Sequence, residues 1–481
     1  MSNGLPPNVS YFMSRLMGVS TSHFKVFAQN SGSQSANKIL RFELPSNTLL
    51  STRSLRMMFN VTTTSTSGSA QVRLPNDTRS FIDRMAIYMG GVLVQNSFSN
   101  YNTLVHAKKA LGADRCSDTT LTHPEICRHV SYHTGVAFST ANPGVEARHE
   151  IYDSLANQLA IVDWEGFLGT AEPGIIDTGL FPQITIEITL ADNVILPQMV
   201  WAHSTTLALA ATTTTEGIAA VGAGTGSYTM DNITMQVEVL GMASSVLDEV
   251  VAQRVSQVGY LSIPFKNYFS FSSSHSATSR FNVNSASWDR LWVAWRDTNG
   301  GSVSAAVPVA GHKFKGAFTG LALNSATTDS VDLGIPQYDS GGSLDTNREK
   351  YVARAFNFPE PVATIGTTIS NFQLQINSAN YPAYKLTVPE AYALTMNSID
   401  VYDKTRIMSL DQYRRNFFCQ CYRFCLPESD YSRLASGLDT RATSAQCALV
   451  TENVTNSTPC FIFAEVTSEL RVANRAIEVI V

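Results

Sequence analysis

Segments in which apolar and polar residues alternate recur along the whole chain of 481 residues. In 184–190, apolar side chains alternate with Thr185, Glu187 and Thr189, and 233–239 repeats this pattern. A β-strand turns successive side chains to opposite faces, so such alternation predicts strands with one buried face. The frequent β-branched residues in these segments favour antiparallel sheets.

The alternation continues to the last residue, because Ile477, Val479 and Val481 are separated by single residues. We therefore expect the C-terminus to lie inside a sheet, where a fused tag would disturb folding. Further strands are expected at 55–61, 265–271, 280–283, 291–295 and 372–376.

Two stretches of the chain, 81–111 and 394–425, have a similar pattern. In each, an alternating strand is followed by a turn and then by a helix that begins at a tyrosine. The second helix has the capping-box sequence Ser409-x-x-Gln412 and apolar residues at helical spacing. This repetition predicts two related units within one chain.

A second match supports the duplication. The segments 41–44 and 280–283 share the sequence Arg-Phe-x-apolar, and an apolar strand follows each of them. Ser245-x-x-Asp248 caps a short helix at the junction of the two halves. The expected organisation is an N-terminal arm at 1–22, a first domain at 23–243, a linking helix at 244–258 and a second domain at 259–481.

Charge is sparse: 15% of the residues are charged, and the formal net charge is −5. A protein that coats nucleic acid needs concentrated Lys and Arg to displace counterions. The basic residues here are scattered, which argues against a sequence-specific nucleic-acid partner.

The cysteines number seven, an odd count in a large chain, which argues against a disulfide framework. The N-terminus lacks the basic-then-apolar pattern of a signal peptide, and no apolar run is long enough to span a membrane. We expect the protein to fold in a reducing compartment.

Two groups of residues have metal-ligand chemistry. The first is His123, Cys127, His129 and His133, whose spacing fits no common zinc pattern and favours a loop with satisfied histidines, although metal binding stays open. The second is a cysteine group on the predicted aromatic helix, which favours buried reduced thiols. Its members are Cys419, Cys421 and Cys425.

Tryptophans recur at Trp288, Trp292 and Trp295, which favours a core or interface stripe over a carbohydrate-stacking platform. A glycosidase needs two carboxylates at a fixed separation, and nothing in the sequence fixes one. The pairs considered are Asp163 with Glu165 and Asp400 with Asp403. No catalytic motif is present, so we predict no catalytic, cofactor or metal site and no enzyme.

Several longer segments together resemble the double jelly-roll major capsid proteins, a family that includes the adenovirus hexon and the capsid proteins of virophages and large DNA viruses. The resemblance is closest to the polinton-like and virophage group, and it covers most of the chain from about residue 24. The segments that carry it are MAIYMGGVLVQNSFSNYNTLVHA, YTMDNITMQVEVLGMASSVLDEVVAQ with YLSIPFKNYFSF, INSANYP, GLDTR and FAEVTSELRVANRAIEVIV.

The resemblance implies an all-β fold of two tandem eight-stranded jelly rolls, that is β-sandwiches, with a few short helices. It also implies a homotrimer that forms a pseudo-hexagonal capsomer of an icosahedral double-stranded DNA virus, located in the virion. Neighbouring capsomers, penton proteins and minor capsid or cement proteins would be its partners. The N-terminal arm would lie at the inner face, near minor proteins or an internal membrane, and 205–228 with 298–347 would form outer towers.

Two other classes remain open from the sequence. One is a tandem β-sandwich carbohydrate-binding protein or adhesin, which a secretion signal would favour. The other is a glycan-active enzyme, which would need a close carboxylate pair in one cleft.

Overall fold

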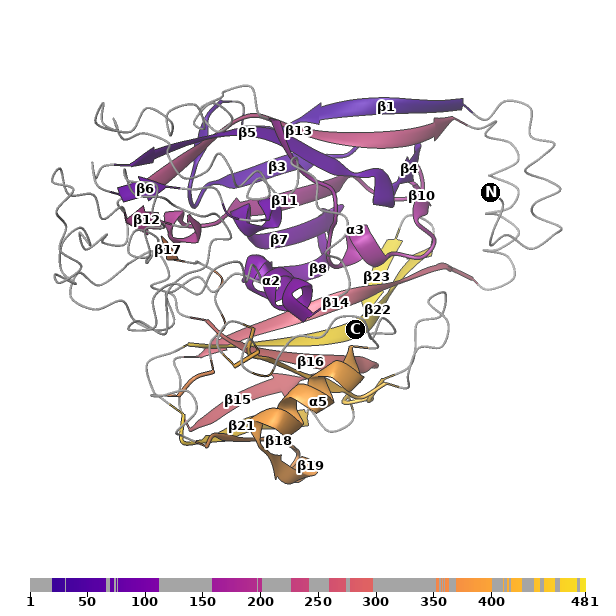
Figure 1. The fold of residues 1–481 in the computed structure, drawn as a ribbon. Helices are drawn as coiled ribbons and strands as arrows, with labels where there is room; N and C mark the ends of the chain where they lie inside the picture. Colours follow the sequence, from indigo (N-terminus) through magenta and orange to yellow (C-terminus); the bar gives the residue numbers. More distant parts are fainter. Residues whose placement is uncertain are drawn as a thin grey trace, which may run out of the picture.

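The computed structural model is built almost entirely from antiparallel strands, which form two sandwiches (Figure 1). No helix in the part of the chain that is described has the length and apolarity needed to cross a bilayer. The structure describes residues 20–30, 32–65, 70–72, 75, 77–111, 158–196, 198–200, 226–241, 259–273, 277–296, 352–353, 356, 358, 360–362, 369–399, 410, 413–414, 417–425, 437–441, 445–454, 459–473 and 476–481.

One sheet of the first sandwich has the strand order β3-β11-β7-β8. Its β11 spans the predicted segment, and its side chains alternate between buried and half-buried positions over the whole length. Alternation therefore predicted this strand correctly, because one face lies on the core and the other does not. The strands are β3 (Ile39–Glu43), β11 (Ile184–Leu190), β7 (Ile82–Met89) and β8 (Val92–Ser99).

The other sheet of the first sandwich is centred on the long strand β13, which pairs with β1 and with β5, while β5 also pairs with β9. Three short strands extend this sheet through pairing with β13 or β4. The strands are β1 (Ser20–Phe27), β13 (Gly226–Gly241), β5 (Arg56–Ser65), β9 (Gln158–Ile161), β2 (Gln34–Ser35), β4 (Leu49–Ser51) and β10 (Ile175–Asp177).

The second sandwich repeats both sheets, with orders β15-β21-β18-β19 and β14-β22-β16-β20. The last strand, β23, pairs with β22, so the predicted incorporation of the C-terminus into a sheet is confirmed. The strands are β15 (Thr278–Val283), β21 (Ala445–Glu452), β18 (Asn371–Ile376), β19 (Ala379–Leu386), β14 (Leu261–Ser273), β22 (Cys460–Ala473), β16 (Trp288–Trp295), β20 (Cys419–Arg423) and β23 (Ala476–Ile480).

The remaining described elements are small. A three-stranded sheet joins strands from both halves of the chain, in the order β17-β12-β6. The helices and these strands are α2 (Tyr101–Leu111), α3 (Phe167–Thr170), α5 (Val388–Ser398), β17 (Val352–Ala353), β12 (Gln198–Val200) and β6 (Ala70–Val72).

The duplication is real, but its second copy was placed wrongly. The hairpin β7-β8 followed by α2 corresponds to the hairpin β18-β19 followed by α5, so 371–398 is the second copy. The residues 394–398 end α5 instead of forming a strand, and β20 occupies part of the predicted second helix. The capping box observed in this half joins Thr387 to Glu390.

The helix prediction was correct only in part: residues 410 and 413–414 are helical, whereas 419–423 form β20. Four successive residues of β20, from Cys419 to Tyr422, are buried, so the strand shows no alternation. A fully buried strand is therefore hard to separate from a buried helix by periodicity alone. The Arg-Phe match was correct, because it places β3 and β15 at equivalent sheet edges.

Several predicted features lie outside the described residues. These are the linking helix, the tower segment 298–347, most of 205–228, and Ser409 with Gln412. Of the arm assigned to 1–22, the described residues Ser20–Ser22 belong to β1 and pair with β13.

Candidate functional site

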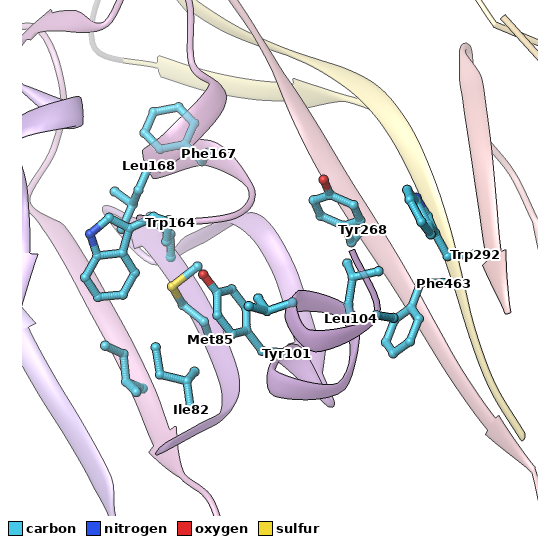
Figure 2. Packing of buried hydrophobic residues seen from close by; sticks show 14 of the residues in the cluster. Ile82, Met85, Tyr101, Leu104, Trp164, Phe167, Leu168, Tyr268, Trp292 and Phe463 are labelled. Carbon is cyan, nitrogen blue, oxygen red and sulfur yellow. The ribbon is translucent and has the colours of Figure 1, made fainter. Parts of the chain in front are cut away.

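The two sandwiches meet along an interface in which β8, α2 and α3 of the first face β14, β16 and β22 of the second (Figure 1). Its centre is apolar. Leu104 of α2 is fully buried and points toward Tyr268, Trp292 and Phe463 (Figure 2). Phe167 of α3 also meets Phe265 of β14 edge to face, with ring centroids 5.2 Å apart. We call this surface the inter-sandwich interface.

Hydrogen bonds cross the same surface. The backbone N–H of Lys266 donates to Thr170 Oγ1 at 2.9 Å. The Arg296 guanidinium donates to Thr103 Oγ1 at 2.7 Å, and its carbon lies 4.5 Å from the ring centroid of Phe356. These bonds fix the two sandwiches in register with one another.

An ion pair of the first sandwich is completed by a tyrosine of the second. Lys108 Nζ lies 2.7 Å from Glu165 Oε2 and 3.1 Å from the hydroxyl of Tyr268. The Tyr268 hydroxyl donates to the same Glu165 oxygen at 3.0 Å. Burial and the nearby Glu165 carboxylate raise the pKa of Tyr268 well above its usual value, so the hydroxyl stays a donor.

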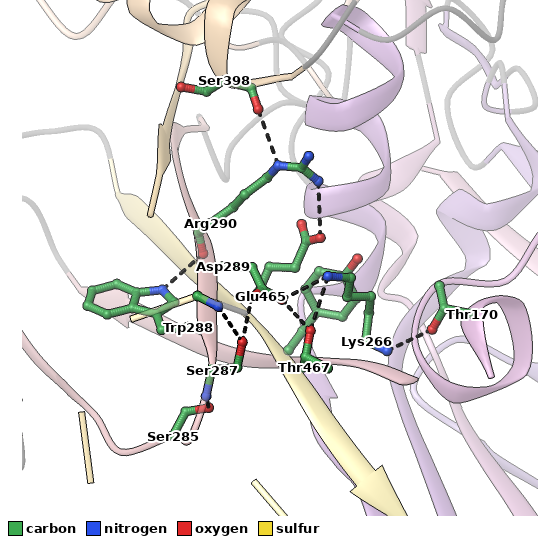
Figure 3. Close-up of polar contacts among 12 residues, drawn as sticks. Thr170, Lys266, Ser285, Ser287, Trp288, Asp289, Arg290, Ser398, Glu465 and Thr467 are labelled. Atoms are coloured by element: carbon green, nitrogen blue, oxygen red, sulfur yellow. Dashed lines mark hydrogen bonds and ion pairs between the residues drawn. The ribbon is translucent and has the colours of Figure 1, made fainter. Parts of the chain in front are cut away.

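A second carboxylate, Glu465 of β22, is buried beside these groups. It accepts a hydrogen bond from Trp292 Nε1 at 3.0 Å. Arg290 Nη1 lies 3.4 Å from Glu465 Oε1 (Figure 3). Burial alone would raise the pKa of Glu465, but Lys108, Arg290, Lys266 and the Trp292 bond outweigh burial and lower it to about 2. Glu465 is therefore a carboxylate at neutral pH.

The third charged group is the pair Lys266–Asp289, with Nζ and Oδ2 2.8 Å apart. Thr467 and Ser287 also donate to the Asp289 carboxylate (Figure 3). Burial raises the pKa of Asp289 in spite of these partners. The charges named at the interface thus have partners inside the protein, which is the arrangement of a structural junction.

The surface depression beside β4 and β10 is not a better candidate for a functional site than the inter-sandwich interface. An open depression of about 390 Å³ is lined by Ser51 of β4, by Arg53 just after it, by Ile175 of β10 and by the segment 172–174 that precedes β10. Arg53 and Glu172 lie 3.9 Å apart, and their side chains are 62% and 35% exposed, respectively. Within the described residues, no group of three or more His, Cys, Asp or Glu side chains is placed to hold a metal ion.

The cysteines singled out in the sequence lie in or next to β20 and are buried thiols outside any disulfide. Burial raises the pKa of the Cys421 thiol well above its usual value, so it behaves as a small apolar group. The interpretation as buried reduced thiols is confirmed, while the helical setting was wrong. The histidine group at 123–133 lies outside the described residues.

The tryptophans form a core stripe on β16, as predicted. Trp288 and Trp295 have no exposed surface and Trp292 has 2%, which rules out a carbohydrate platform built from them. Of the carboxylates considered, Asp163 is exposed and Glu165 is held by Lys108 and Tyr268. Asp400 and Asp403 lie outside the described residues.

Sequence reasoning missed the charged residues of the interface. Lys266 and Glu465 each stand alone within an apolar strand segment, IPFKNYF and CFIFAEV. A single charge among mostly apolar residues of a strand indicates a buried, paired side chain. That signal was present, but the partner residues come from distant segments and cannot be read from spacing.

Comparisons with known proteins identify the fold. No protein-family profile and no curated protein sequence matches the chain. A chain of the PBCV-1 virus capsid matches with 11% identity, 97% coverage of both chains and a TM-score of 0.50. PBCV-1 VP54, from a crystal structure fitted into a reconstruction of the virophage Sputnik, matches with 11% identity, 97% coverage of both chains and a TM-score of 0.51.

The Faustovirus major capsid protein is also similar, with 11% identity, a TM-score of 0.48 and coverage of 98% of this chain and 95% of that one. The two PBCV-1 likenesses span nearly all of each chain and agree with the paired sheets described above. The chain therefore has the double jelly-roll fold, as the sequence resemblance predicted.

Proposed function

We propose that the chain is a structural major capsid protein, three copies of which form a pseudo-hexagonal block of an icosahedral shell. The observation that carries this proposal is the likeness to a chain of the PBCV-1 virus capsid over 97% of both chains. In this proposal the protein is part of the virion and has no enzymatic role.

The physical construction supports a shell role. Each chain supplies two similar sandwiches, so three chains supply six similar units around one axis. The inter-sandwich interface holds the two units rigidly, through a shared apolar core and paired buried charges. A rigid block with 15% charged residues suits tight lateral packing, because each buried unpaired charge would be costly.

The partners follow from the same proposal. Neighbouring capsomers would pack against the sides of the block, and penton and minor capsid or cement proteins would fill its junctions. The N-terminal arm, 1–22, would lie at the inner face beside minor proteins or an internal membrane. The tower segments 205–228 and 298–347 would point outward.

The mass of the purified full-length protein tests the proposal. Sedimentation velocity and light scattering should give three chain masses that persist on dilution, and negative-stain images should show particles with a hexagonal outline. A monomer at micromolar concentration would overturn the proposal.

A further inference from the structure

Lys266 and Asp289 form an ion pair that is almost completely buried, since their side chains are 9% and 1% exposed. Their Nζ and Oδ2 atoms are 2.8 Å apart. In the other lysine pair of the interface, Lys108 and Glu165 are 27% and 17% exposed. Burial destabilises the charged forms of both groups, and a lysine, unlike an arginine, can lose its proton. The buried pair is therefore suited to react as a neutral amine and a carboxylic acid.

The sheet brings the two groups together across an intervening strand. Lys266 of β14 lies opposite Thr467 of β22, whereas Asp289 belongs to β16 on the other side of β22. The register of β16 shifts between Trp288 and Arg290, which leaves Asp289 without an opposite residue on β22, as in a β-bulge. A bulge redirects a side chain, and here the Asp289 carboxylate contacts both Lys266 and Thr467 (Figure 3).

Two hydroxyl groups complete the arrangement. Thr467 Oγ1 accepts a hydrogen bond from Lys266 Nζ at 3.1 Å and donates one to Asp289 Oδ2 at 2.5 Å, so it connects the amine to one carboxyl oxygen. Ser287 Oγ accepts from the Gly437 N–H at 2.7 Å and donates to Asp289 Oδ1 at 2.8 Å. When an amine adds to the carboxyl carbon, Oδ1 becomes negative, and Ser287 lies where an oxyanion donor is needed.

We propose that Lys266 and Asp289 condense to an isopeptide bond within the folded chain. A proton first passes from the Lys266 ammonium through the Thr467 hydroxyl to Asp289 Oδ2, which leaves a neutral amine and a carboxylic acid. Nζ then adds to Cγ of Asp289, a second proton follows the same route, and the Cγ–Oδ2 bond breaks to release Oδ2 as water. The hydrogens of the ammonium end on the amide nitrogen and on this water, so the reaction needs no oxidant or other reactant.

The folded protein supplies what this reaction lacks in water. The fold holds the amine and the carboxyl group in contact, which replaces a bimolecular encounter with an intramolecular step. Asp289 has no exposed surface, so bulk water has little access to hydrolyse the new bond. Burial raises the pKa of Asp289, which favours the acid form that the amine attacks. Each chain reacts once, so the group is a modification site and not the active site of an enzyme.

The bond joins β14 to β16 across β22. The same β14 forms part of the inter-sandwich interface, where the Lys266 N–H donates to Thr170. The described cysteines are not joined in disulfides, and an amide forms without an oxidant and is not cleaved by thiols. Such a bond suits the reducing compartment expected from the sequence. The inference does not depend on the capsid role, and its test leaves that role untouched.

Mass spectrometry of the purified full-length protein tests the bond. After denaturation, the chain should be lighter than its sequence mass by one water molecule. Trypsin cleaves after lysine and arginine, but it does not cleave after a lysine whose amine is part of an amide. The linked protein should therefore yield one branched product that joins 255–280 to 281–290. The unlinked protein would yield the separate peptides 255–266, 267–280 and 281–290.

Fragmentation of the branched product should locate the bond between Lys266 and Asp289. This step separates the proposed bond from other losses of water, such as a cyclised aspartate or a dehydrated serine, because neither of these joins two peptides. The measurement is made on freshly purified protein and again after long storage of the native protein.

Substitutions test the chemistry. Thr467→Val keeps the shape of the side chain but removes the hydroxyl, and it should slow bond formation by about a hundredfold or more. Thr467→Ser is the matched control, because it keeps a hydroxyl and should be linked like the wild type. Lys266→Arg keeps a cation beside Asp289 but has no amine that can be deprotonated, so it should show the full mass. Circular dichroism confirms that each variant is folded.

The wild-type result decides the proposal even if a variant fails to fold. A wild type with the full mass and separate tryptic peptides, both when fresh and after storage, overturns the proposal. A mass lower by one water without the branched product also overturns it. A folded Thr467→Val protein that is linked as fast as the wild type overturns the route of the proton through Thr467.

Discussion

The carboxylate of Glu465 keeps its charge inside the protein because Lys108, Arg290 and Lys266 surround it and Trp292 donates to it. A buried charge of this kind adds little net stability over an apolar residue, but its removal leaves its partners uncompensated. It also fixes geometry, since Trp292 and Arg290 reach it only in one arrangement of β16 and β22.

This environment gives Glu465 a defined pH signature. Its pKa falls from 4.5 to about 2 on folding, so its stabilising contribution is complete above pH 4.5 and is lost as the pH falls toward 2. Glu465→Gln should therefore flatten the dependence of the unfolding free energy on pH in this window. At neutral pH the variant should lose about 3 kcal/mol or more, because the buried cations lose their counter-charge.

Urea unfolding of both proteins from pH 2 to 7 measures the effect. Glu478→Gln is the control, since Glu478 is exposed on β23. Asp289 contributes with the opposite sign because burial raises its pKa, so the difference between wild type and variant isolates Glu465. Equal slopes for wild type and Glu465→Gln would contradict the assignment.

The described cysteines give a second prediction for single residues. All are buried thiols outside any disulfide, and burial raises the pKa of the Cys447 thiol to about 12. Because the thiolate is the reactive form, iodoacetamide at pH 8 should leave them unmodified in the native protein and modify them in denaturant. Peptide mass spectrometry measures this for each site; rapid native labelling of Cys419, Cys421, Cys425, Cys447 or Cys460 would contradict the described core.

Whether an element could be predicted from the sequence depended on how many of its faces are buried. The strand β11 was predicted over its full length because only one of its faces is buried. The strand β20 was taken for a helix because burial on both faces removed the alternation. The helix α5 was missed because part of its sequence was assigned to a strand, although Thr387 and Glu390 carry a capping-box spacing with Pro389 in the first turn.

The C-terminal strand offers a test at this scale. Ile477 and Val479 of β23 pack against the core, and the backbone oxygen of Val481 accepts a hydrogen bond from Ala286 N–H at 2.9 Å. Ile477→Ser should lower the unfolding free energy by about 1–2 kcal/mol through lost apolar burial. Glu478→Ser is the matched control on the same strand and should change it by less than about 0.5 kcal/mol.

Chemical denaturation at a fixed protein concentration provides the comparison, since association also stabilises the folded chain. Equal losses for the two serine variants would mean that β23 is not docked on β22. Deletion of 476–481 should be more damaging than either substitution, because it also removes the ladder to β22 and the bond to Ala286.

For the whole molecule, the duplicated pattern and the resemblance gave the correct architecture, two tandem jelly rolls. The inter-sandwich interface could not be predicted from the sequence, because it brings together residues from four separate segments. These are Lys108, Glu165, Tyr268 and Glu465. Such contacts depend on how two finished sandwiches dock, and local periodicity carries no information about docking.

The shared interface predicts that the two sandwiches unfold together. Leu104, Tyr268, Trp292 and Phe463 form one buried cluster across the junction, so opening either sandwich exposes apolar surface of the other (Figure 2). Calorimetry of the wild type should show a single transition. Tyr268→Phe keeps the ring but removes the hydroxyl that bonds Glu165, at a cost of about 1–2 kcal/mol, and should shift that transition as a whole.

Tyr384→Phe is the matched control, because the Tyr384 side chain is 57% exposed and lies far from the junction on β19. It should leave the transition within the error of the wild type at the same protein concentration. Two separate transitions, only one of which moves in Tyr268→Phe, would mean that the sandwiches fold independently. A single transition that moves in Tyr268→Phe alone would instead identify the junction as part of the cooperative core, so that each chain behaves as one rigid building unit.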